Sequence, residues 1–284
     1  MSTRPASAAT SAIAEADTTI DVAGRAMQAP GLKARIYGKR KPGSAAPLVL
    51  HFHGGAFVSG DLDSGACMAR LLAEVGAVVV SVAYPLAPEH RFPEAVEAGY
   101  AALEWVYKQR NKLGGKGAPV YLAGDEAGGN LAAAVALVAR DRGHPPLAGQ
   151  ILVAPMLDPC VGTASLRETQ ECMAGCKWAD GWQQYLRGPM DAEHPYAVPG
   201  KATRLVGLPP ALILTGADDP MRDEAMAYAQ RLRDAGIAVT SNLMPTQTGW
   251  PDSLTEPPTQ ECPCAVGVKK HLSAFFAQAT PPPS

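Results

Sequence analysis

The sequence predicts an α/β protein with a mostly parallel central sheet and helices on both faces. The chain has 284 residues, 47% of them hydrophobic, enough to build one large core. Apolar runs of strand length alternate with segments of helical periodicity over most of the chain, the pattern of a parallel sheet with crossover helices. Residues 78–84 form a nearly continuous run rich in Val, typical of a strand covered on both faces.

The first part of the chain leads into this sheet. Residues 1–30 contain few large apolar side chains, and we expect loose structure or a short helix there, outside the core or as part of a lid. Residues 32–37 alternate apolar and polar, as a half-buried strand does. Residues 46–53 are a second expected strand, and 64–73 an expected helix.

The middle of the chain alternates regularly. After the strand at 78–84 comes a loop rich in proline, and Pro93 is well placed as the first residue of a helix. Residues 120–122 are an apolar strand, and 131–140 have helical spacing. The remaining core elements are expected as strands at 150–155, 210–215 and 237–243 and as helices at 221–232 and 265–278.

The alternation stops between residues 160 and 205. This segment contains three cysteines and two tryptophans, and we interpret it as an inserted lid. The predicted organisation is therefore an N-terminal segment at 1–30, a core formed by 31–159 and 206–280, and a lid at 160–205. The aromatic side chains expected to line the pocket or the core are Trp178, Trp182, Tyr185 and Trp250.

The turn between the strand at 120–122 and its helix is unusually sharp. Gly124 and Gly128 flank position 126 at a distance of two residues, which lets the backbone fold tightly and makes the central side chain stand out from the turn. This is the pattern of a nucleophile elbow, Gly-x-Ser-x-Gly. Here the central residue is Glu126 rather than serine.

Composition excludes several classes of function. The net charge of −2 gives no reason to expect a nucleic acid or an anionic membrane as partner, and there is no run of eighteen apolar residues. The N-terminus lacks the apolar stretch of a secretory signal, so we expect a cytoplasmic protein. No cofactor and no metal are expected. Neither Cys172-x3-Cys176 nor Cys262-x-Cys264 has the usual spacing of a metal-binding pair, and free thiols or disulfides are the expected state of the six cysteines.

Four motifs occur in an order that points to one family. They are His53-Gly-Gly-Ala-Phe57, Tyr84-Pro-Leu-Ala-Pro-Glu-His-Arg-Phe-Pro93, Gly124-Asp-Glu-Ala-Gly-Gly-Asn130, and Leu208-Pro-Pro-Ala211 followed by Asp219-Pro-Met-Arg-Asp-Glu224. From about residue 47 to 278 the chain resembles the bacterial hormone-sensitive-lipase family of α/β-hydrolases. The resemblance implies the α/β-hydrolase fold with a lid, carboxylesterase activity through a Ser–Asp–His triad, and dimerisation as a common state.

The resemblance also shows where this chain departs from the family. Glu126 stands in the place of the nucleophile, and Thr248 in the place of the catalytic histidine. Asp219 matches the remaining triad member, although it is also well placed to cap the helix that follows. Ala56 replaces the third glycine of the oxyanion loop. The histidines at the end of the second strand, His51 and His53, are expected to be structural.

Three interpretations of Glu126 follow. The carboxylate can fill the oxyanion hole formed by the amides of Gly54, Gly55 and Ala127, as a structural plug in a ligand-binding descendant. It can instead act as a base or nucleophile, making the protein a hydrolase, lyase or dehydratase. An engineered inactive variant is the third, but the second replacement at Thr248 argues against a single laboratory substitution.

The sequence therefore favours a pseudoenzyme of this family. We expect it to bind a small apolar ligand with a carbonyl or carboxyl end, with little or no ester hydrolysis. The alternative is an active enzyme that uses Glu126 with the oxyanion hole.

Overall fold

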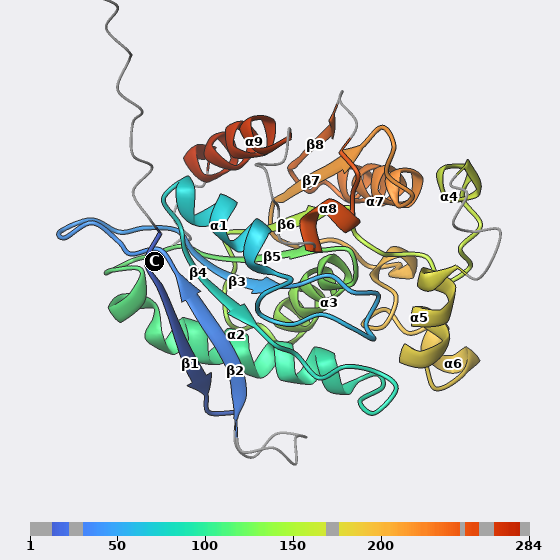
Figure 1. The fold of residues 1–284 in the computed structure, drawn as a ribbon, viewed down its shortest axis with the longest axis horizontal. Coiled ribbons are helices and arrows are strands. Elements are labelled where there is room, and N and C mark those ends of the chain that lie inside the picture. The colour runs from blue at the N-terminus through green and yellow to red at the C-terminus, as the bar shows by residue number, and fades with distance from the viewer. Residues whose placement is uncertain (1–12, 23–30, 169–175, 245–247, 256–263, 279–284) are drawn as a thin grey trace, which may run out of the picture.

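A single eight-stranded sheet organises the molecule (Figure 1). The computed structural model describes residues 13–22, 31–168, 176–244, 248–255 and 264–278. The strand order is β1-β2-β4-β3-β5-β6-β7-β8. The strands are β1 (Glu15–Ile20), β2 (Leu32–Tyr37), β3 (Leu48–Phe52), β4 (Val78–Val82), β5 (Val120–Asp125), β6 (Gly149–Val153), β7 (Ala211–Gly216) and β8 (Val239–Met244).

The sheet is parallel from β4 through β8 and antiparallel only at its first edge. β1 pairs antiparallel with β2, and β2 pairs antiparallel with β4, whereas all later pairs are parallel. The predicted α/β-hydrolase fold, with a mostly parallel sheet and helices on both faces, is thus confirmed. The expectation of loose structure for the N-terminal residues was wrong at 15–20, which form the edge strand β1.

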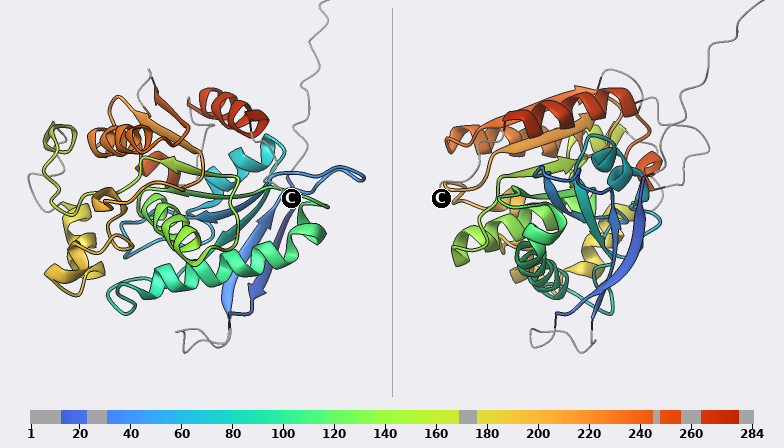
Figure 2. Two further views of the ribbon diagram at one scale, coloured as in Figure 1. Left: turned by 180° about the vertical axis from the view of Figure 1, so that it is seen from behind. Right: turned by 90° about the vertical axis from the view of Figure 1, so that its left-hand side faces the viewer.

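Helices cover both faces of the sheet. One apolar cluster contains side chains of α1, α8 and α9, and the other contains side chains of α2, α3 and α7. Figure 2 shows α9 and α2 on opposite sides of the sheet. The helices are α1 (Ala66–Glu74), α2 (Glu94–Leu113), α3 (Ala127–Arg142), α4 (Ala164–Glu168), α5 (Lys177–Tyr185), α6 (Pro189–Ala192), the 3-10 helix η2 (Pro199–Lys201), α7 (Arg222–Asp234), α8 (Asp252–Thr255) and α9 (Ala265–Gln278).

The central strands explain why this arrangement is stable. Every residue of β3, β4, β5, β6 and β7 is buried, because helices lie against both sides of the sheet. α3 is also buried almost around its whole circumference, since it packs on β5 and β6 and against α2. Small residues on α3 make this close packing possible, and they fix the position of its N-terminus relative to the sheet.

The 160–205 segment lies between β6 and β7. Its described residues form α4, α5, α6 and η2. α5 packs on the core through aromatic side chains: the ring of Tyr185 stacks on Phe57 at 4.0 Å between centroids, and Trp182 lies 5.0 Å from the same Phe57 ring. The segment therefore contacts the loop that follows β3 directly.

Parallel strands bring their carboxyl ends to one edge of the sheet, where ligand sites of α/β proteins form. β3 ends at Phe52, β5 at Asp125 and β7 at Gly216. The loops that start after these three strands contain the motifs that the sequence singled out.

Candidate active site

The turn after β5 has the strained geometry of a nucleophile elbow. Glu126 has φ 53° and ψ −116°, a backbone conformation that residues other than glycine rarely adopt. A Cβ atom at Gly124 would lie 2.1 Å from the carbonyl oxygen of Gly128, and a Cβ at Gly128 would lie 2.1 Å from that of Phe52. Only glycine fits at these two positions, so the turn is forced to present the side chain of residue 126.

The Glu126 carboxylate accepts three hydrogen bonds. Oε2 accepts from the backbone N–H of Gly55, and from that of Ala56 at 3.1 Å. Oε1 accepts from the indole Nε1–H of Trp178 at 2.7 Å. The residue is only 2% exposed, and it stands at the N-terminus of α3, where the helix dipole favours a negative charge.

The oxyanion loop differs in detail from the sequence-based expectation of Gly54, Gly55 and Ala127. The Gly54 amide donates to Asp125 Oδ2 at 2.9 Å, so the amides that meet Glu126 are those of Gly55 and Ala56. Ala127 is buried as the first residue of α3. The expectation failed at Gly54 because the path of the loop, with positive φ at 55, 56 and 57, turns the second and third amides toward the elbow.

Burial raises the pKa of the Glu126 carboxyl above its ordinary value. The hydrogen bonds from Gly55, Trp178 and Ala56 and the charge of Lys177 act in the opposite direction and offset part of this effect. Because its three hydrogen-bond partners are all donors, the arrangement is suited to the ionised carboxylate.

Thr248 points to Asp218 rather than to Asp219. Its hydroxyl donates to Asp218 Oδ1 at 2.9 Å, and its backbone N–H donates to the same carboxylate, as does that of Gly249. These hydrogen bonds lower the pKa of Asp218 in spite of desolvation, which acts to raise it. Gln247, the residue before Thr248, lies outside the described residues.

Asp219 lies in the turn before α7 and does not cap that helix, whose N-cap residue is Met221. Oδ1 accepts from the N–H of Met221 at 2.8 Å, and Oδ2 accepts from the Thr215 hydroxyl at 2.6 Å. Burial raises the pKa of Asp219 to about 6, against these hydrogen bonds, which lower it. The three positions that the resemblance matches to a triad, 126, 219 and 248, thus lie on loops at the carboxyl edge of the sheet. In the described part of the chain, no two of their side chains are hydrogen-bonded to each other.

A second group of polar residues is buried beside the elbow, and the sequence analysis did not assemble it. The Ser81 hydroxyl lies 3.0 Å from His51 Nδ1, and His51 Nε2 lies 3.1 Å from Asp125 Oδ1. All three residues are at most 1% exposed. Since Asp125 also holds the Gly54 amide, this chain of hydrogen bonds supports the oxyanion loop. The sequence offered one sign of this group: a serine in the otherwise Val-rich strand β4, where a buried hydroxyl needs a hydrogen-bond partner.

His53 is also structural in its contacts. Its Nδ1 lies 2.7 Å from the carbonyl oxygen of Gly54, and its ring stacks on Tyr84 at 4.3 Å between centroids. Desolvation lowers the pKa of His53, so the neutral imidazole is favoured. The Tyr84 hydroxyl donates to the His53 carbonyl at 2.9 Å, which ties the proline-rich motif to the oxyanion loop.

α5 closes over Glu126 from the 160–205 segment. Besides the hydrogen bond from Trp178, Lys177 forms an ion pair with Asp252 of α8, and its ammonium lies 4.8 Å from the centre of the Trp178 ring. A Cβ atom at Gly181 would lie 2.3 Å from the Ala56 carbonyl oxygen, so the helix approaches the loop backbone very closely. The sequence placed Trp178 in the pocket or core without indicating this hydrogen bond.

The cysteines do not form a metal centre in the described part of the chain, where no group of three or more His, Cys, Asp or Glu side chains could hold an ion. Cys67, Cys160 and Cys176 are not in disulfide bonds. Cys264 is disulfide-bonded to a partner outside the described residues. Cys172 and Cys262 also lie outside them.

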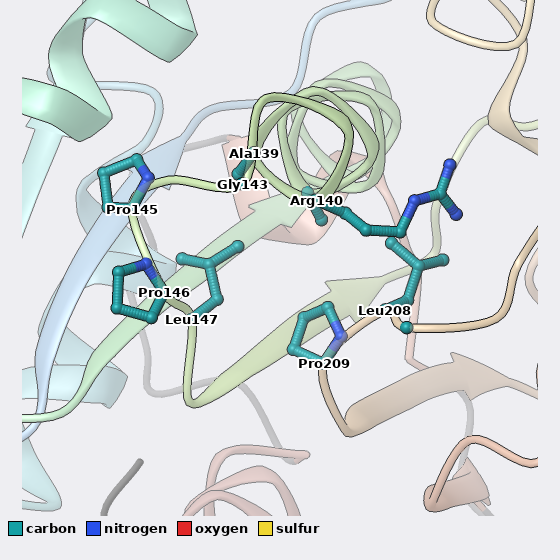
Figure 3. A pocket seen from close by; sticks show the side chains of 10 residues that line it. Ala139, Arg140, Gly143, Pro145, Pro146, Leu147, Leu208 and Pro209 are labelled. Carbon is teal, nitrogen blue, oxygen red and sulfur yellow. The ribbon is translucent and has the colours of Figure 1, made fainter. Parts of the chain in front are cut away.

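A separate groove of about 410 Å³ lies at the other end of α3 (Figure 3). Its walls are largely proline and leucine, and the Arg140 guanidinium beside it donates to Asp141 and to the Arg204 carbonyl. Since α3 runs from Ala127 to Arg142, a helix of this length places the groove roughly 20 Å from the elbow. It is therefore distinct from the candidate site.

Comparison with known proteins agrees with the fold. Residues 49–248 match the family described as alpha/beta hydrolase fold, and the chain belongs to this family. Esterase LipI of Mycobacterium tuberculosis is 40% identical over 199 residues, covering 68% of this chain and 62% of its own. Carboxylesterase NlhH of the same species is 38% identical over 214 residues, covering 70% and 65%. The chain thus spans slightly less than two thirds of the length of these relatives.

Other relatives extend the range of functions. The gibberellin receptor GID1B of Arabidopsis thaliana is 33% identical over 208 residues, covering 68% of this chain and 57% of its own. Among solved structures, the metagenomic carboxylesterase EstE1 superposes with a TM-score of 0.80 at 32% identity, covering 94% of this chain and 90% of that one. In the described part of the chain, no helix is both long and apolar enough to cross a membrane.

Proposed function

We propose that this protein is a pseudoenzyme of the carboxylesterase-like α/β-hydrolases that binds a small, mostly apolar ligand at the elbow without hydrolysing esters there. The observation that carries the proposal is the contact of Glu126 Oε2 with the amides of Gly55 and Ala56. In an acyl-transfer enzyme, such amides hold the oxygen that becomes negative in the transition state.

The carboxylate opposes ester hydrolysis in two ways. It occupies the donors, and losing one oxyanion donor typically costs about 2.7–4 kcal/mol of transition-state stabilisation. It also places a negative charge next to the site where a second one would develop, a repulsion of roughly 4 kcal/mol at about 4 Å with an effective dielectric constant of about 20.

A general base is also missing from the contacts of Glu126. Its described hydrogen-bond partners are two backbone amides and an indole, and none is an imidazole. The two histidines before the elbow contact other groups: His51 lies between Ser81 and Asp125, and His53 lies against Gly54. A covalent intermediate on Glu126 would therefore lack the histidine that activates water.

The same contacts restrict the ligand. An ionised ligand carboxylate would be repelled by Glu126, so a neutral end, such as a ketone, ester or hydroxyl group, fits better than the carboxyl end also expected from the sequence. The buried aromatic side chains of α5 make the surroundings of Glu126 apolar, which suits the rest of such a molecule. The receptor name of GID1B supports the view that this scaffold can serve for binding.

Catalysis by Glu126 is a second candidate, favoured by burial, which raises the pKa of its carboxyl toward a range useful for a base. Proton abstraction next to a carbonyl, with the enolate held by neighbouring amides, would make the protein a lyase or dehydratase. In this case Glu126 must leave the amides of Gly55 and Ala56.

Hydrolysis through the Ser81–His51–Asp125 chain is a third candidate, because these are the residue types of an esterase triad. The burial of Ser81, in the middle of β4 with no exposed surface, argues against it. A Cβ atom at Gly65 would lie only 3.4 Å from this hydroxyl, so the chain at the start of α1 lies directly against it.

One set of assays separates the three. Wild type, E126A and S81A are compared on p-nitrophenyl acetate and butyrate, and we expect no turnover above buffer for any of them. Turnover lost in E126A would overturn the proposal in favour of Glu126 catalysis, and turnover lost in S81A alone would assign it to the buried chain.

Binding is measured with 2-octanone, a carbonyl ligand that cannot be hydrolysed. It should raise the Tm of the wild type in proportion to the logarithm of its concentration above Kd. Replacing Trp178 by leucine should weaken this shift. No shift at saturating 2-octanone would contradict the binding role.

A further inference from the structure

A second groove, of about 340 Å³, lies at the opposite end of the sheet from Glu126. Its apolar lining comes from Ile36 near the end of β2, Val78 at the start of β4 and Leu113 at the end of α2. Its polar lining is cationic and contains no acidic residue: the charged side chains are Lys39, Arg40 and Lys112.

The position of the groove separates it clearly from the candidate site. Leu48 of β3 is in register with both Val78 of β4 and Val120 of β5, so the groove lies level with the start of β5. Glu126 follows the last residue of that strand. At about 3.3 Å per residue, the six residues of β5 place the two sites roughly 20 Å apart.

The groove is shaped by a loop anchored on both sides. Gly38 has φ +77°, and a Cβ atom there would lie 2.7 Å from the Ala77 carbonyl oxygen, so the chain turns tightly over the start of β4. At the far end of the loop, the Ala46 amide donates to the Gly114 carbonyl at 2.8 Å. Figure 1 shows this blue loop beside the C-terminal end of α2. Both ends of the loop are therefore fixed by backbone contacts, as expected for the wall of a binding site.

The positive charge at the rim is not balanced locally. Residues 33–42 contain five basic and no acidic side chains, and residues 108–116 contain four basic and none acidic, in a chain with a net charge of −2. Arg35 is paired with Asp17 and Asp63 on the neighbouring edge. Among the described residues, the side chains of Lys39, Arg40 and Lys112 form no hydrogen bond or ion pair.

The helix dipole explains only part of this cluster. Lys112 lies in the last turn of α2, where a cation stabilises the helix end. Lys39 and Arg40 belong to no helix, yet they line the same groove. Three cations held around an apolar floor are complementary to a ligand that has one anionic end and an apolar body.

We propose that this groove is a second ligand site, which binds a single-chain carboxylate with an apolar tail, such as a medium-chain fatty acid. The tail lies on Ile36, Val78 and Leu113, and the carboxylate meets Lys39, Arg40 and Lys112. The inference does not depend on the function proposed for Glu126, since that residue repels the anionic end of the same ligand.

Isothermal titration calorimetry with sodium octanoate at low salt tests the site. The groove variant K39Q/R40Q/K112Q is compared with K33Q/R91Q/K270Q, which removes two lysines and one arginine from exposed positions outside the groove. We expect the groove variant to bind octanoate at least about tenfold more weakly than wild type, from three lost charge interactions. The control variant should stay within about twofold.

Two control ligands show whether the groove recognises the charge, the apolar tail or both. In the wild type, acetate should bind far more weakly because it lacks the tail, and 1-octanol because it lacks the charge. Equal losses in both triple variants would overturn the proposal by showing a general charge effect, and equal binding of acetate and octanoate would reduce the site to counterion binding. Thermal melts of each variant establish that all three proteins are folded.

Two further experiments test whether octanoate binds at Glu126 instead, and whether the groove binds a lipid surface instead. If E126Q rather than the groove variant abolishes octanoate binding, the ligand occupies the elbow and the inference fails. If wild type floats with phosphatidylglycerol vesicles in a groove-dependent manner but does not bind octanoate, the groove recognises a bilayer surface, which also overturns the proposal.

Discussion

At the scale of single residues, the carboxylate at position 126 determines what the amides of Gly55 and Ala56 bind. A serine hydroxyl would leave the amides of Gly55 and Ala56 free for a substrate oxygen. Glu126 takes both of them and adds the indole of Trp178. The site therefore contains its own anion.

Restoring the missing groups tests this view. E126S/T248H should gain turnover of p-nitrophenyl butyrate, whereas E126S and T248H alone should not, since a nucleophile and its base act as a unit. Because Thr248 contacts Asp218, the new imidazole should use that carboxylate, and adding D218N should remove the gained activity. A fully inactive double variant with wild-type stability would contradict the expected loop geometry.

Asp219 makes folding stability depend on pH. Its pKa is raised to about 6 by burial, above the ordinary 3.8, so the folded state binds the proton more tightly than the unfolded chain. Its ionisation therefore costs stability: this contribution is most favourable below pH 4 and is lost as the pH rises through 6.

We expect the free energy of unfolding of wild type to fall relative to D219N between pH 4 and 7, by up to about 3 kcal/mol for a shift of about 2 pKa units. Urea denaturation at several pH values measures the difference. Burial also raises the pKa of Glu126, so its ionisation lowers the stability in the same direction. Wild type and D219N are therefore also compared in an E126Q background. A difference in unfolding free energy that does not change with pH would show that the pKa of Asp219 is not raised.

At the scale of elements, α5 is the helix that joins the 160–205 segment to the elbow. It contributes Trp178 to Glu126 and Lys177 to Asp252, and it rests on the oxyanion loop through Gly181. The position of one short helix thus depends on a charge in the turn before α3.

A double-mutant cycle measures this dependence. W178F should destabilise the protein by about 1.5–3 kcal/mol beyond the packing loss, because it leaves a buried carboxylate without one of its donors. W182F is the matched control, since Trp182 is equally buried on the same helix but contacts Phe57. In an E126A background the excess cost of W178F should disappear, and an unchanged cost would exclude the coupling.

At the scale of the whole molecule, two ligand sites are proposed at opposite ends of one rigid sheet. The strands between them are fully buried, and neither site shares a residue with the other. We therefore expect independent binding: saturation with 2-octanone should leave the Kd for octanoate unchanged within about twofold. A larger change in calorimetric titrations would show that the sheet transmits a conformational change.

The fold could be predicted because its central strands are mostly apolar and its sharpest turn is marked by two glycines. β1 was missed because its residues are mostly polar and exposed, and pairing with β2 rather than burial makes it a strand. The plug interpretation named the Gly55 amide as a partner of Glu126, but the other partners of Glu126 and the partner of Thr248 were not predictable from motifs. They depend on the φ angles of the loop at 55–57 and on which of two adjacent aspartates faces Thr248.

The backbone amides of residues 54–56 donate hydrogen bonds to the carboxylates of two consecutive residues. Asp125 holds Gly54, and Glu126 holds Gly55 and Ala56. Asp125 is in turn fastened to His51 and Ser81, so truncating residue 126 leaves one of the two clamps in place. Residue 126 can therefore change, and with it the chemistry of the site, while the contacts of Asp125 keep the loop after β3 in place.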